Sequence, residues 1–592
     1  MHQVKTRPDS PAFRTRVAGA WHSVSWAQWH TAAREVAAGL AARGLGPGAR
    51  VAVLAREGAA SMAVDLGITA LGAVTIPLPP GVPAPELGAI LRDAEVTCLF
   101  ADAEFTARLA GACGSLGAMI ELTADGSGGR GLETLRAQGR AALADGPAPS
   151  QLAAVAERMV PSDAWCILYT SGTTGVPRGI ILTHGAAIYQ GCALAEAGGL
   201  GPDDEQLLVL PTSQIFGRMA LQAGVAAGMP TAIGGVRSFD RDVVEIAPVY
   251  FSAVPDLLER LAARWRDALD AAGWARPALE RALAVGRRVS ALRQRGEAIP
   301  LGLGMQHRLA ERMVLTRLRA QLGTRLRFVA CGGAALRRDL VDFFHAFGVS
   351  VLEGYGLTEA GGVVAWNRPD DFRFGTLGRI LPGCDAKLAD DGELLVRSPS
   401  LGTPLRTDPD QPSVDEGGYL HTGDIAELQD GFVRLVGRKR DIIKTIGGKL
   451  IAPQKLEVRL AACEGIARAV VLGEGRARPV VLVDIDEDAM MDLARREGLG
   501  CRSRSDLVEH PRIRAHIAEA IAAVNASLAR HEAIADFGLL AEPLLASAGE
   551  LTATGALRRQ SIAARHADQV ATLGAGGAGG ESPAGPSATA SA

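Results

Sequence analysis

The chain has 592 residues and nearly balanced charge, with 62 Lys and Arg against 65 Asp and Glu and a net charge of −3. This balance excludes a strongly cationic nucleic-acid binder and an acidic tail protein. The length allows roughly four domains of about 150 residues and a large buried core. Six of the basic residues are lysines, and four of these lie between Lys439 and Lys455. In a chain that otherwise uses arginine, this cluster suggests a place where the smaller ammonium group matters.

The eight cysteines are scattered and form no CxxC pair, which argues against a zinc site and a disulfide framework. The first 16 residues are polar and basic without an apolar core, so they do not resemble a secretory signal. The longest apolar run, residues 66–78, is shorter than the roughly 18 residues that span a bilayer. We therefore expect a soluble protein of the reducing cytoplasm.

Short apolar segments alternate with helical periodicity between Val51 and Phe100, and the pattern resumes after Asp163. This alternation predicts an α/β fold with parallel strands. Residues 111–150 are small and rich in Gly and Ala, and we interpret them as a loop-rich excursion.

Residues 281–327 are predicted to be helical, because their apolar residues recur at spacings near three and four. Ten arginines and two glutamates lie between Arg287 and Arg327. One interpretation is a solvated basic helix pair. The other is a surface that binds phosphates or anionic lipid headgroups, which leaves open a peripheral contact at the inner membrane surface. The apolar positions of the pattern are Leu309, Met313, Leu315, Leu318 and Leu322.

After Gly392, short alternating strands predict a small β unit that ends near Gly437. Two apolar segments and a helical stretch at 506–531 then predict a compact α+β domain. From Gly574 onward the chain consists mainly of Gly, Ala, Ser and Pro, and it is expected to be disordered.

The strongest chemical signal is WCILYTSGTTGVPRGIILTH, residues 165–184. An apolar strand enters a run of Gly, Ser and Thr, and another apolar strand leaves it. The backbone N–H groups and four hydroxyl groups of this run suit a polyphosphate. The run lacks the GxxxxGK[ST] register of a Walker loop, and a strand rather than a helix follows it. Taken alone, a run of this composition is more often a plain turn.

Three further motifs change this interpretation, namely GYGLTE at 354–359, HTGD at 421–424 and GRKRDIIKTIGGKLIAP at 437–453. Together with YTSGTTGVPRG at 169–179, they resemble in order the signatures of the adenylate-forming superfamily. This superfamily contains acyl-CoA synthetases, peptide-synthetase adenylation domains and firefly-type luciferases. The resemblance covers the chain from about position 25 to 565.

The resemblance implies an α/β fold: a large N-terminal domain of parallel-rich sheets with helices and a small β unit, followed by a small mobile α+β domain. The implied division is a domain that binds the acyl group and ATP at 1–437, a hinge at 438–441, a mobile domain at 442–570 and a disordered tail at 571–592. The small domain of the superfamily typically rotates between the two steps of the reaction.

The resemblance also implies a binding site for ATP and Mg²⁺. The phosphates would bind to a loop that consists of Thr170, Ser171, Gly172, Thr173, Thr174 and Gly175, with Arg178 after it. The nucleotide base would lie against Gly332, Gly333, Ala334, Tyr355 and Gly356.

Four further residues would complete that site. Thr358 would contact the α-phosphate, and Glu359 would bind the magnesium ion. Asp424 would accept the ribose hydroxyl groups as an ionised carboxylate. Arg438 would help to hold the ribose and the phosphate.

In the second step of the superfamily's reaction, a thiol, commonly that of CoA, attacks the acyl-adenylate. The matching motif would place the hinge at Arg440 and would bring Gly447 to the pantetheine tunnel. Lys444 and Lys449 would lie near that tunnel or near the nucleotide. A phosphopantetheinyl carrier protein in place of CoA is an open alternative.

Within the superfamily, the chain more closely resembles long-chain fatty-acyl-CoA synthetases. The segments that carry this resemblance are LPTSQIFGR at 210–218, VPDLLERL at 254–261, the helical AVGRRVSALRQRG and RFVACGGAALRRDLVDFF at 327–344. The implied substrate is a medium- to long-chain fatty acid, or a similar apolar carboxylic acid, in an apolar tunnel behind Gly332 and Gly333. Gln214 stands where the family commonly has His, at a position that often lines the acyl or nucleotide pocket. Gln can donate a hydrogen bond there but cannot carry charge.

One departure bears directly on catalysis. Near the C-terminus the family has a lysine that bridges the substrate carboxylate and the nucleotide, and Ala556 stands in its place within LTATGALRR at 551–559. Loss of one preorganised donor costs on the order of 10²- to 10³-fold in rate. Four explanations stay open: an engineered inactivating change, an enzyme in which Arg558 or Arg559 substitutes, an enzyme of the thioester half-reaction alone, and a nucleotide-binding pseudoenzyme.

Overall fold

The protein was analysed as a computed structural model, in which two compact units follow each other along the chain, Met1–Leu435 and Val436–Ala592. The division lies two residues before the predicted end of the first domain at 437. A mixed α/β fold with a large first domain and a smaller second domain confirms the predicted fold class. The structure describes residues 2–109, 118–122, 131–171, 177–270, 276–406, 413–545, 547–551 and 557–573.

The first unit contains a seven-stranded sheet with a parallel centre. Strand β3 (Arg50–Leu54) pairs in parallel with both of its neighbours, and its residues are almost wholly buried. Buried parallel strands are typically continuous apolar runs, which is the pattern seen between Val51 and Phe100. The strand order is β18 (Thr403–Pro404), β8 (Pro177–Thr183), β7 (Ala164–Ser171), β4 (Val74–Pro77), β3, β5 (Cys98–Ala101) and β6 (Ala118–Glu121).

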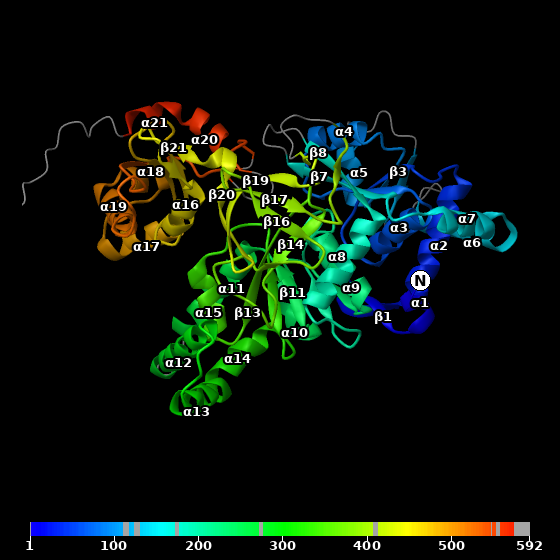
Figure 1. The fold of residues 1–592 in the computed structure, drawn as a ribbon, viewed down its shortest axis with the longest axis horizontal. Helices are drawn as coiled ribbons and strands as arrows, with labels where there is room; N and C mark the ends of the chain where they lie inside the picture. The colour runs from blue at the N-terminus through cyan, green and yellow to red at the C-terminus, as the bar shows by residue number, and fades with distance from the viewer. Residues whose placement is uncertain are drawn as a thin grey trace, which may run out of the picture. The chain divides into compact units, whose positions relative to one another are not determined.

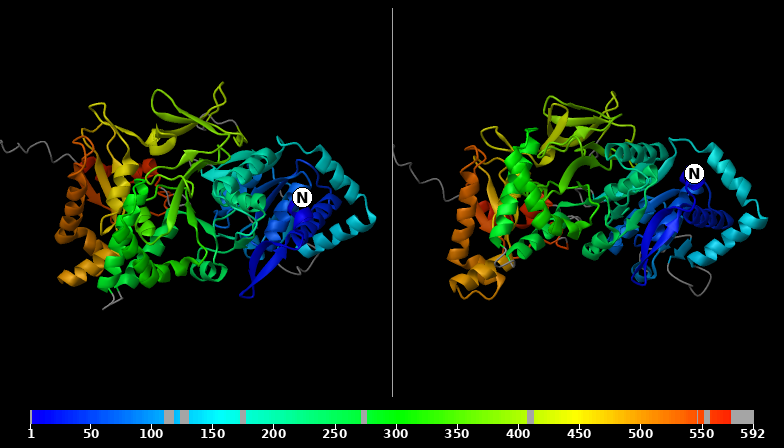
Figure 2. Two further views of the ribbon diagram at one scale, coloured as in Figure 1. Left: turned by 60° about the horizontal axis from the view of Figure 1, so that its bottom comes forward. Right: turned by 90° about the horizontal axis from the view of Figure 1, so that it is seen from below.

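Helices around this sheet correct one sequence interpretation. Helix α6 (Leu132–Asp145) packs against α2 (Trp26–Ala42), although residues 111–150 were expected to be loop-rich. At this contact, a Cβ added to Gly139 would lie 1.8 Å from the carbonyl oxygen of Glu35. The small residues therefore allow two helix backbones to approach closely. Helices α3 (Ala59–Ala70) and α7 (Ala148–Arg158) pack on the same face of the sheet as α2 and α6, whereas α4 (Ala84–Asp93) and α5 (Ala103–Leu109) pack on the opposite face. The chain begins with the short helix α1 (His2–Thr6), and the blue to cyan segments lie together in both views of Figure 2.

A second sheet of thirteen strands runs through the rest of the unit. Its centre is parallel, from β9 through β11 and β12 to β13, and the strands after β13 pair antiparallel. The predicted small β unit is continuous with this sheet. The order is β16 (Asp385–Leu388), β17 (Glu393–Arg397), β19 (Leu420–Gln429), β20 (Phe432–Arg438), β15 (Arg379–Ile380), β14 (Gly362–Trp366), β13 (Ser350–Leu357), β12 (Phe328–Cys331), β11 (Tyr250–Ala253), β9 (Gln206–Leu208), β10 (Thr231–Ile233), β1 (Pro11–Val17) and β2 (Ala20–Ser25).

Helices α8 (His184–Ala197) and α9 (Ile215–Ala227) lie between the two sheets (Figure 1). Ala187 of α8 packs with the apolar residues of β7 and β8, whereas Ala193 packs with Tyr250 and Phe328 of the larger sheet. A helix that is covered on two sides carries apolar residues around much of its circumference. The pair thus connects the two sheets and forms one wall of the site described below.

The remaining helices of the first unit cover the far part of the larger sheet. Trp265 of α11 (Pro255–Asp270) packs edge-on against Phe347, in a cluster with Phe343 and Phe344 of α15 (Arg338–Ala346). The predicted helical segment 281–327 is present. The elements here are α10 (Phe239–Ile246), α11, α12 (Arg276–Gln294), α13 (Leu301–Ala310), the π-helix η2 (Glu311–Leu315), α14 (Thr316–Arg319), the 3₁₀ helix η3 (Ala320–Leu322) and α15.

The second unit has its own apolar core, which is formed by a three-stranded sheet and helices on it. Helix α21 extends to Thr572, and Leu573 is buried against the core, although the disordered tail was predicted to start at 571. Residues 574–592 lie outside the described residues. The elements are η4 (Lys439–Asp441), β21 (Ile443–Lys444), β22 (Leu450–Ile451), α16 (Pro453–Ala461), β23 (Ile466–Leu472), β24 (Val480–Ile485), α17 (Glu487–Glu497), α18 (Arg504–Glu509), α19 (Pro511–Asn525), β25 (Asp536–Leu539), α20 (Arg559–Arg565) and α21 (Ala567–Thr572).

Each cysteine in the described part of the chain is a free thiol. None of the described helices combines the length and the hydropathy that a membrane crossing requires.

Candidate active site

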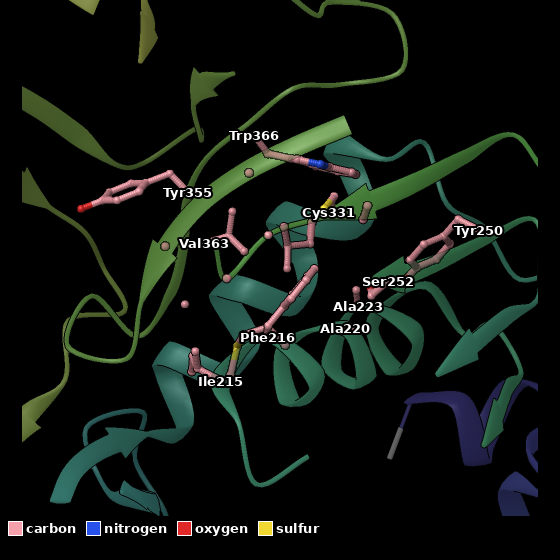
Figure 3. Close-up of a pocket in the computed structure, with 18 of the residues that line it drawn as sticks. Ile215, Phe216, Ala220, Ala223, Tyr250, Ser252, Cys331, Tyr355, Val363 and Trp366 are labelled. Carbon is pink, nitrogen blue, oxygen red and sulfur yellow. The ribbon is translucent and has the colours of Figure 1, made fainter. Parts of the chain in front are cut away.

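A large apolar cavity lies between α9 and strands β11 to β14, with an empty volume of about 740 Å³ including its mouth. Figure 3 shows Tyr355 at one end and Tyr250, Ser252 and Ala223 at the other. One wall is the face of α9 that carries residues at spacings of three and four, and the opposite wall is the sheet. The lining residues on α9 are Ile215, Phe216, Met219, Ala220 and Ala223.

The cavity lies next to the glycine turn after β12, where Gly332 and Gly333 were predicted to bound the acyl tunnel. Both glycines line it, as do Gly356 and Tyr355. Gly333 has a φ of +87°, which favours glycine. Ala334, the next residue of the predicted adenine-flanking turn, is exposed. In the structure, this turn therefore borders an apolar cavity.

Tyr355, which lines the cavity, contacts Asp424, and both residues were predicted to bind the nucleotide. The Tyr355 hydroxyl donates a hydrogen bond to Oδ2 of Asp424 at 2.6 Å, and both side chains are buried. Asp424 is held in place by its backbone N–H, which donates to the hydroxyl of Thr422. That hydroxyl in turn donates to the carbonyl oxygen of Leu394. GYGLTE and HTGD thus meet in space although about 70 residues separate them.

Thr358 and Glu359 lie on the turn that follows β13. Thr358 is buried and Glu359 is half-buried. The turn is fixed by two backbone hydrogen bonds, from Gly361 N–H to Thr358 O and from Gly402 N–H to Glu359 O, both 2.9 Å. Gly361 has a φ of +73°, and a Cβ there would lie 1.7 Å from the carbonyl oxygen of Ser400. A side chain at this position would therefore displace the turn.

The predicted phosphate loop lies at the tip of the antiparallel hairpin of β7 and β8. Thr170 pairs with Arg178 in this hairpin, and both are half-buried. The backbone of Ser171 ends β7 and pairs with Pro177. The remaining loop residues of the prediction, Gly172, Thr173, Thr174 and Gly175, lie outside the described residues.

Gln214 is exposed at the N-terminal end of α9 and does not belong to the residues that line the cavity in the described structure. The next two residues, Ile215 and Phe216, do line it. The motif LPTSQIFGR therefore contributes to the cavity wall through its apolar residues, and Gln214 lies beside the cavity.

The remaining predicted residues belong to the second unit or to the strand that leads into it. Arg438 ends β20 and is half-buried, and Arg440 is exposed in η4. Lys444, Gly447 and Lys449 lie on an exposed hairpin of β21 and β22, which is closed by a 2.9 Å bond from Thr445 N–H to Lys449 O.

Ala556 itself lies outside the described residues, but the structure restricts one proposed substitute for the missing lysine. The Arg559 guanidinium donates to both carboxylate oxygens of Glu457 at 2.7 Å and to the carbonyl oxygen of Val471. Glu457 is buried, so removing its partner would leave an uncompensated charge in the core. Arg559 is therefore occupied within the second unit, whereas the Nε–H of the half-buried Arg558 donates to no partner among the described residues.

Two buried polar residues that support the site were missed in the sequence. The side-chain amide of Gln190 on α8 donates to Val363 O and to Ser400 Oγ and accepts from Val363 N–H, which fixes β14 at the cavity wall. Arg218 on α9 donates to both carboxylate oxygens of Asp65 and to Thr212 O, and it stacks on Trp165. A charged residue within the apolar helix of residues 215–227 was the available signal for Arg218.

Comparison with known proteins identifies the family. The model of the AMP-binding enzyme matches residues 1–403, and that of the AMP-binding enzyme C-terminal domain matches residues 440–575. The chain belongs to the AMP-binding enzyme family. This confirms the resemblance to adenylate-forming enzymes that the four motifs carried.

Similar proteins match almost the whole chain. The long-chain-fatty-acid–CoA ligase FadD15 of Mycobacterium bovis is 30% identical over 583 residues, which are 96% of this chain and 94% of that protein. The anthranilate CoA ligase AuaEII in complex with anthranoyl-AMP has a similar fold, with a TM-score of 0.70 and 18% identity, over 96% of each chain. The o-succinylbenzoate CoA synthetase of Bacillus subtilis in complex with ATP and magnesium has a TM-score of 0.66 and 19% identity, over 95% of this chain and 98% of that one.

Proposed function

We propose that this AMP-binding enzyme is an ATP-dependent acid–thiol ligase that activates a medium- to long-chain fatty acid and transfers the acyl group to CoA. The observation that carries the proposal is the apolar cavity lined by Tyr355, whose empty volume is about 740 Å³ including its open mouth, together with the contact between Tyr355 and Asp424. A cavity of this kind suits an acyl chain whose carboxylate lies at the polar end. The similarity to FadD15, a long-chain-fatty-acid–CoA ligase, supports the same substrate class.

In the first step, a carboxylate oxygen attacks the α-phosphorus of ATP. A bond forms between that oxygen and phosphorus, and pyrophosphate leaves with the electron pair of the broken bond. In this proposal the loop from Thr170 to Gly175 and Arg178 hold the departing phosphates, and Thr358 donates to the α-phosphate. Fixed donors of this kind stabilise the charge that develops in the transition state.

The nucleotide would be held by residues that the fold already orients. Tyr355, Gly356 and the turn from Gly332 to Ala334 would flank the adenine, and the buried carboxylate of Asp424 would accept the ribose hydroxyl groups. Arg438 would assist at the ribose and the phosphate. A buried carboxylate with a fixed orientation makes strong hydrogen bonds to hydroxyl groups.

Magnesium fits the residues of the turn after β13, because the half-buried Glu359 carboxylate and the Thr358 hydroxyl are hard oxygen donors on one fixed turn. Bound there, the ion would neutralise charge on the phosphates as pyrophosphate leaves. Glu359 would hold it.

In the second step, the sulfur of CoA attacks the acyl carbon and loses its proton to solvent, the thioester bond forms, and AMP leaves with the electron pair of the acyl–oxygen bond. The exposed hairpin of β21 and β22 would take part at this stage through Gly447, with Lys444 and Lys449 beside it and the hinge at Arg440. Rotation of a small domain about a few linker residues is a common conformational change in enzymes with two half-reactions.

The test is the formation of AMP and acyl-CoA from ATP, Mg²⁺ and CoA with octanoate, dodecanoate, palmitate or oleate. We expect product with the longer acids, and absence of AMP and acyl-CoA with every acid would refute the ligase proposal. Replacing CoA by a phosphopantetheinyl carrier protein tests the alternative acceptor, since a higher rate with the carrier would contradict the choice of CoA.

The role of Ala556 is tested separately. If adenylation is impaired by the missing lysine, Ala556→Lys raises the rate of adenylation by about 10²- to 10³-fold, and Ala556→Met, of similar length without charge, does not. Supply of purified acyl-adenylate bypasses that step, so thioester formation is expected to be equal in both variants. If Arg558 instead supplies the cation, Arg558→Ala abolishes adenylation in the parent, and Ala556→Lys restores it.

A further inference from the structure

Helix α13 carries an exposed apolar stripe that nothing in the described structure covers. The side chains of Leu301, Met305 and Leu309 are 90%, 71% and 60% exposed. They are four residues apart on a regular helix, so they lie within a narrow arc of one face. The opposite face is anchored, because Leu303, His307 and Ala310 are buried. A single exposed apolar residue is ordinary, but three on one helix face mark an interaction surface.

One residue of this stripe belongs to the spacing that predicted the helical segment. Leu309 is one of its apolar positions, together with Leu315 and Leu322. Leu315 and Leu322 are buried, whereas Leu309 points to the outside. The helix therefore has two apolar faces, and the packing of the first unit uses one of them.

Arginines accompany the stripe. Helical geometry places Arg308 on the same face as Leu301 and Met305, and Arg312 follows four residues later in the π-helix η2. Both are exposed, as are Arg287 and Arg288 on the preceding helix α12. None of these four arginines forms an ion pair with a residue that the structure describes, and their charge is left uncompensated there.

Nearby acidic side chains do not neutralise these arginines. Glu297 pairs with Arg295, and Glu311 contacts Arg319 and His307. This surface is therefore both apolar and positively charged. We call it the α13 surface, and it consists of Leu301, Met305, Arg308, Leu309 and Arg312. Figure 1 places α12 and α13 at the periphery of the first unit, away from the seven-stranded sheet.

We propose that the α13 surface docks onto an anionic lipid membrane. The leucines and the methionine would enter the boundary between headgroups and acyl chains, and the arginines would contact lipid phosphates. Amphipathic helices with apolar residues on one side and arginines at its edge bind membranes in this way. The exposed stripe contributes the hydrophobic part of the binding free energy, and the unpaired guanidinium groups contribute the electrostatic part.

The positive charge of the α13 surface favours an anionic lipid membrane over a second copy of the chain as the binding partner. In a twofold dimer the same patch faces itself, so Arg308 and Arg312 of both copies would be brought together. Like charges at short distance oppose such a contact. A phosphate-rich surface instead complements them, and each arginine near it strengthens binding by about fivefold.

The proposal goes beyond the proposed function and does not rest on it, since membrane binding is measured without ATP, acid or CoA. It would nevertheless suit a ligase for fatty acids, because these substrates partition into bilayers. Docking through α13 would be reversible, since one short helix face gives weak anchoring compared with a membrane-spanning segment.

The experiment uses the full chain and sedimentation with vesicles of phosphatidylcholine alone or of phosphatidylcholine with phosphatidylglycerol. We expect binding to the anionic vesicles that weakens at high salt, and little binding to the neutral ones. L301S/M305S/L309S should lower the partition coefficient by at least about tenfold, because burial of each apolar side chain is lost. R308E/R312E should lower it by a similar or larger factor.

Two exposed residues elsewhere on the first unit provide matched controls. V244S on α10 and R92E on α4 remove an exposed apolar side chain and an exposed arginine far along the chain from α13. We expect both to bind as the parent does, and all variants to keep the parent's melting temperature because the altered side chains are exposed.

Three results would overturn the proposal. The parent fails to bind anionic vesicles, or the apolar triple variant binds as well as the parent, or the controls lose as much binding as the α13 variants. If the parent is a dimer that L301S/M305S/L309S dissociates, the α13 surface is an interface between copies and the membrane proposal is wrong.

Discussion

The far end of the cavity should set the acyl chain length. Ala223 of α9 is buried and lies beside Tyr250 and Ser252 at the end opposite Tyr355 (Figure 3). In the substitution Ala223→Phe, the phenyl ring would occupy the space of the terminal carbons of a long acid. A short acid would not reach this point, because its carboxylate must stay at the polar end.

The ring is about as large as a segment of four methylene groups, and each buried methylene contributes about 0.8 kcal/mol to binding. Excluding such a segment therefore costs about 3 kcal/mol, or about 200-fold in kcat/KM. We expect this loss with palmitate and less than about threefold with octanoate. The preferred acid should shift toward shorter chains.

The assay is kcat/KM for acyl-CoA formation with palmitate and octanoate in the parent and in the variant. Ala226→Phe is the matched control, because Ala226 is exposed on the same helix. Overpacking in a core costs about 1–3 kcal/mol of stability. The melting temperature of each variant is therefore measured as well, to separate a loss of stability from a loss of acid binding. Equal losses with both acids, or no loss with palmitate, would show that the acyl chain does not end at Ala223.

Three further predictions concern the supports of the site. Arg218→Met should lower the free energy of unfolding by about 3 to 5 kcal/mol in denaturant titration, because the carboxylate of Asp65 loses its partner. Gly361→Ala should lower kcat/KM by about 10²-fold, since the added Cβ would meet the carbonyl oxygen of Ser400 and move the turn that carries Thr358 and Glu359. Burial raises the pKa of Glu353 from 4.5 to about 7. Between these pH values the folded state therefore keeps a proton that the unfolded state releases. The free energy of unfolding should fall by up to about 3 kcal/mol as the pH rises from 4.5 to 7. Glu353→Gln removes this dependence, which thermal unfolding at pH 5 and pH 8 measures.

Each of these has its own contrary outcome. The double variant Arg218→Met/Asp65→Leu should recover much of the lost stability, and no recovery would contradict the charge argument. Gly44→Ala is the control for backbone strain alone, because Gly44 also has a positive φ but open space around it. If Glu353→Gln changes stability equally at both pH values, the raised pKa is not the cause.

The residues proposed to bind the nucleotide could be selected from the sequence because they stand in short motifs with unusual composition. GYGLTE and HTGD could be assigned without knowing that Tyr355 and Asp424 touch. The glycines of such motifs have structural causes that the chain alone does not display. Gly361 is needed because Ser400 lies against it, and that contact joins segments about 40 residues apart.

The acyl end was not accessible in the same way. Ala220, Ala223 and Tyr250 are ordinary apolar residues, and they line a cavity because α9 meets β11 at that point. Helix α6 gives a second example. The composition around Gly139 suggested a loop, whereas in the structure Gly139 allows α6 to approach α2 closely. The residue type limits the structures in which a residue can occur. The residue that it contacts in the fold decides whether it lies in a loop, at a helix contact or in a cavity wall.

The arginine bias of the chain gives the missing lysine its meaning. A chain with 62 basic residues and six lysines can replace lysine by arginine wherever charge alone is required, as in Arg178 of the proposed phosphate loop. At position 556 the residue is alanine, so charge itself is absent. Arg559 cannot supply it without abandoning the buried carboxylate of Glu457. Any compensation within this motif therefore falls to Arg558, and otherwise adenylation depends on the donors of the first unit alone, which is the case in which Ala556→Lys produces its largest gain.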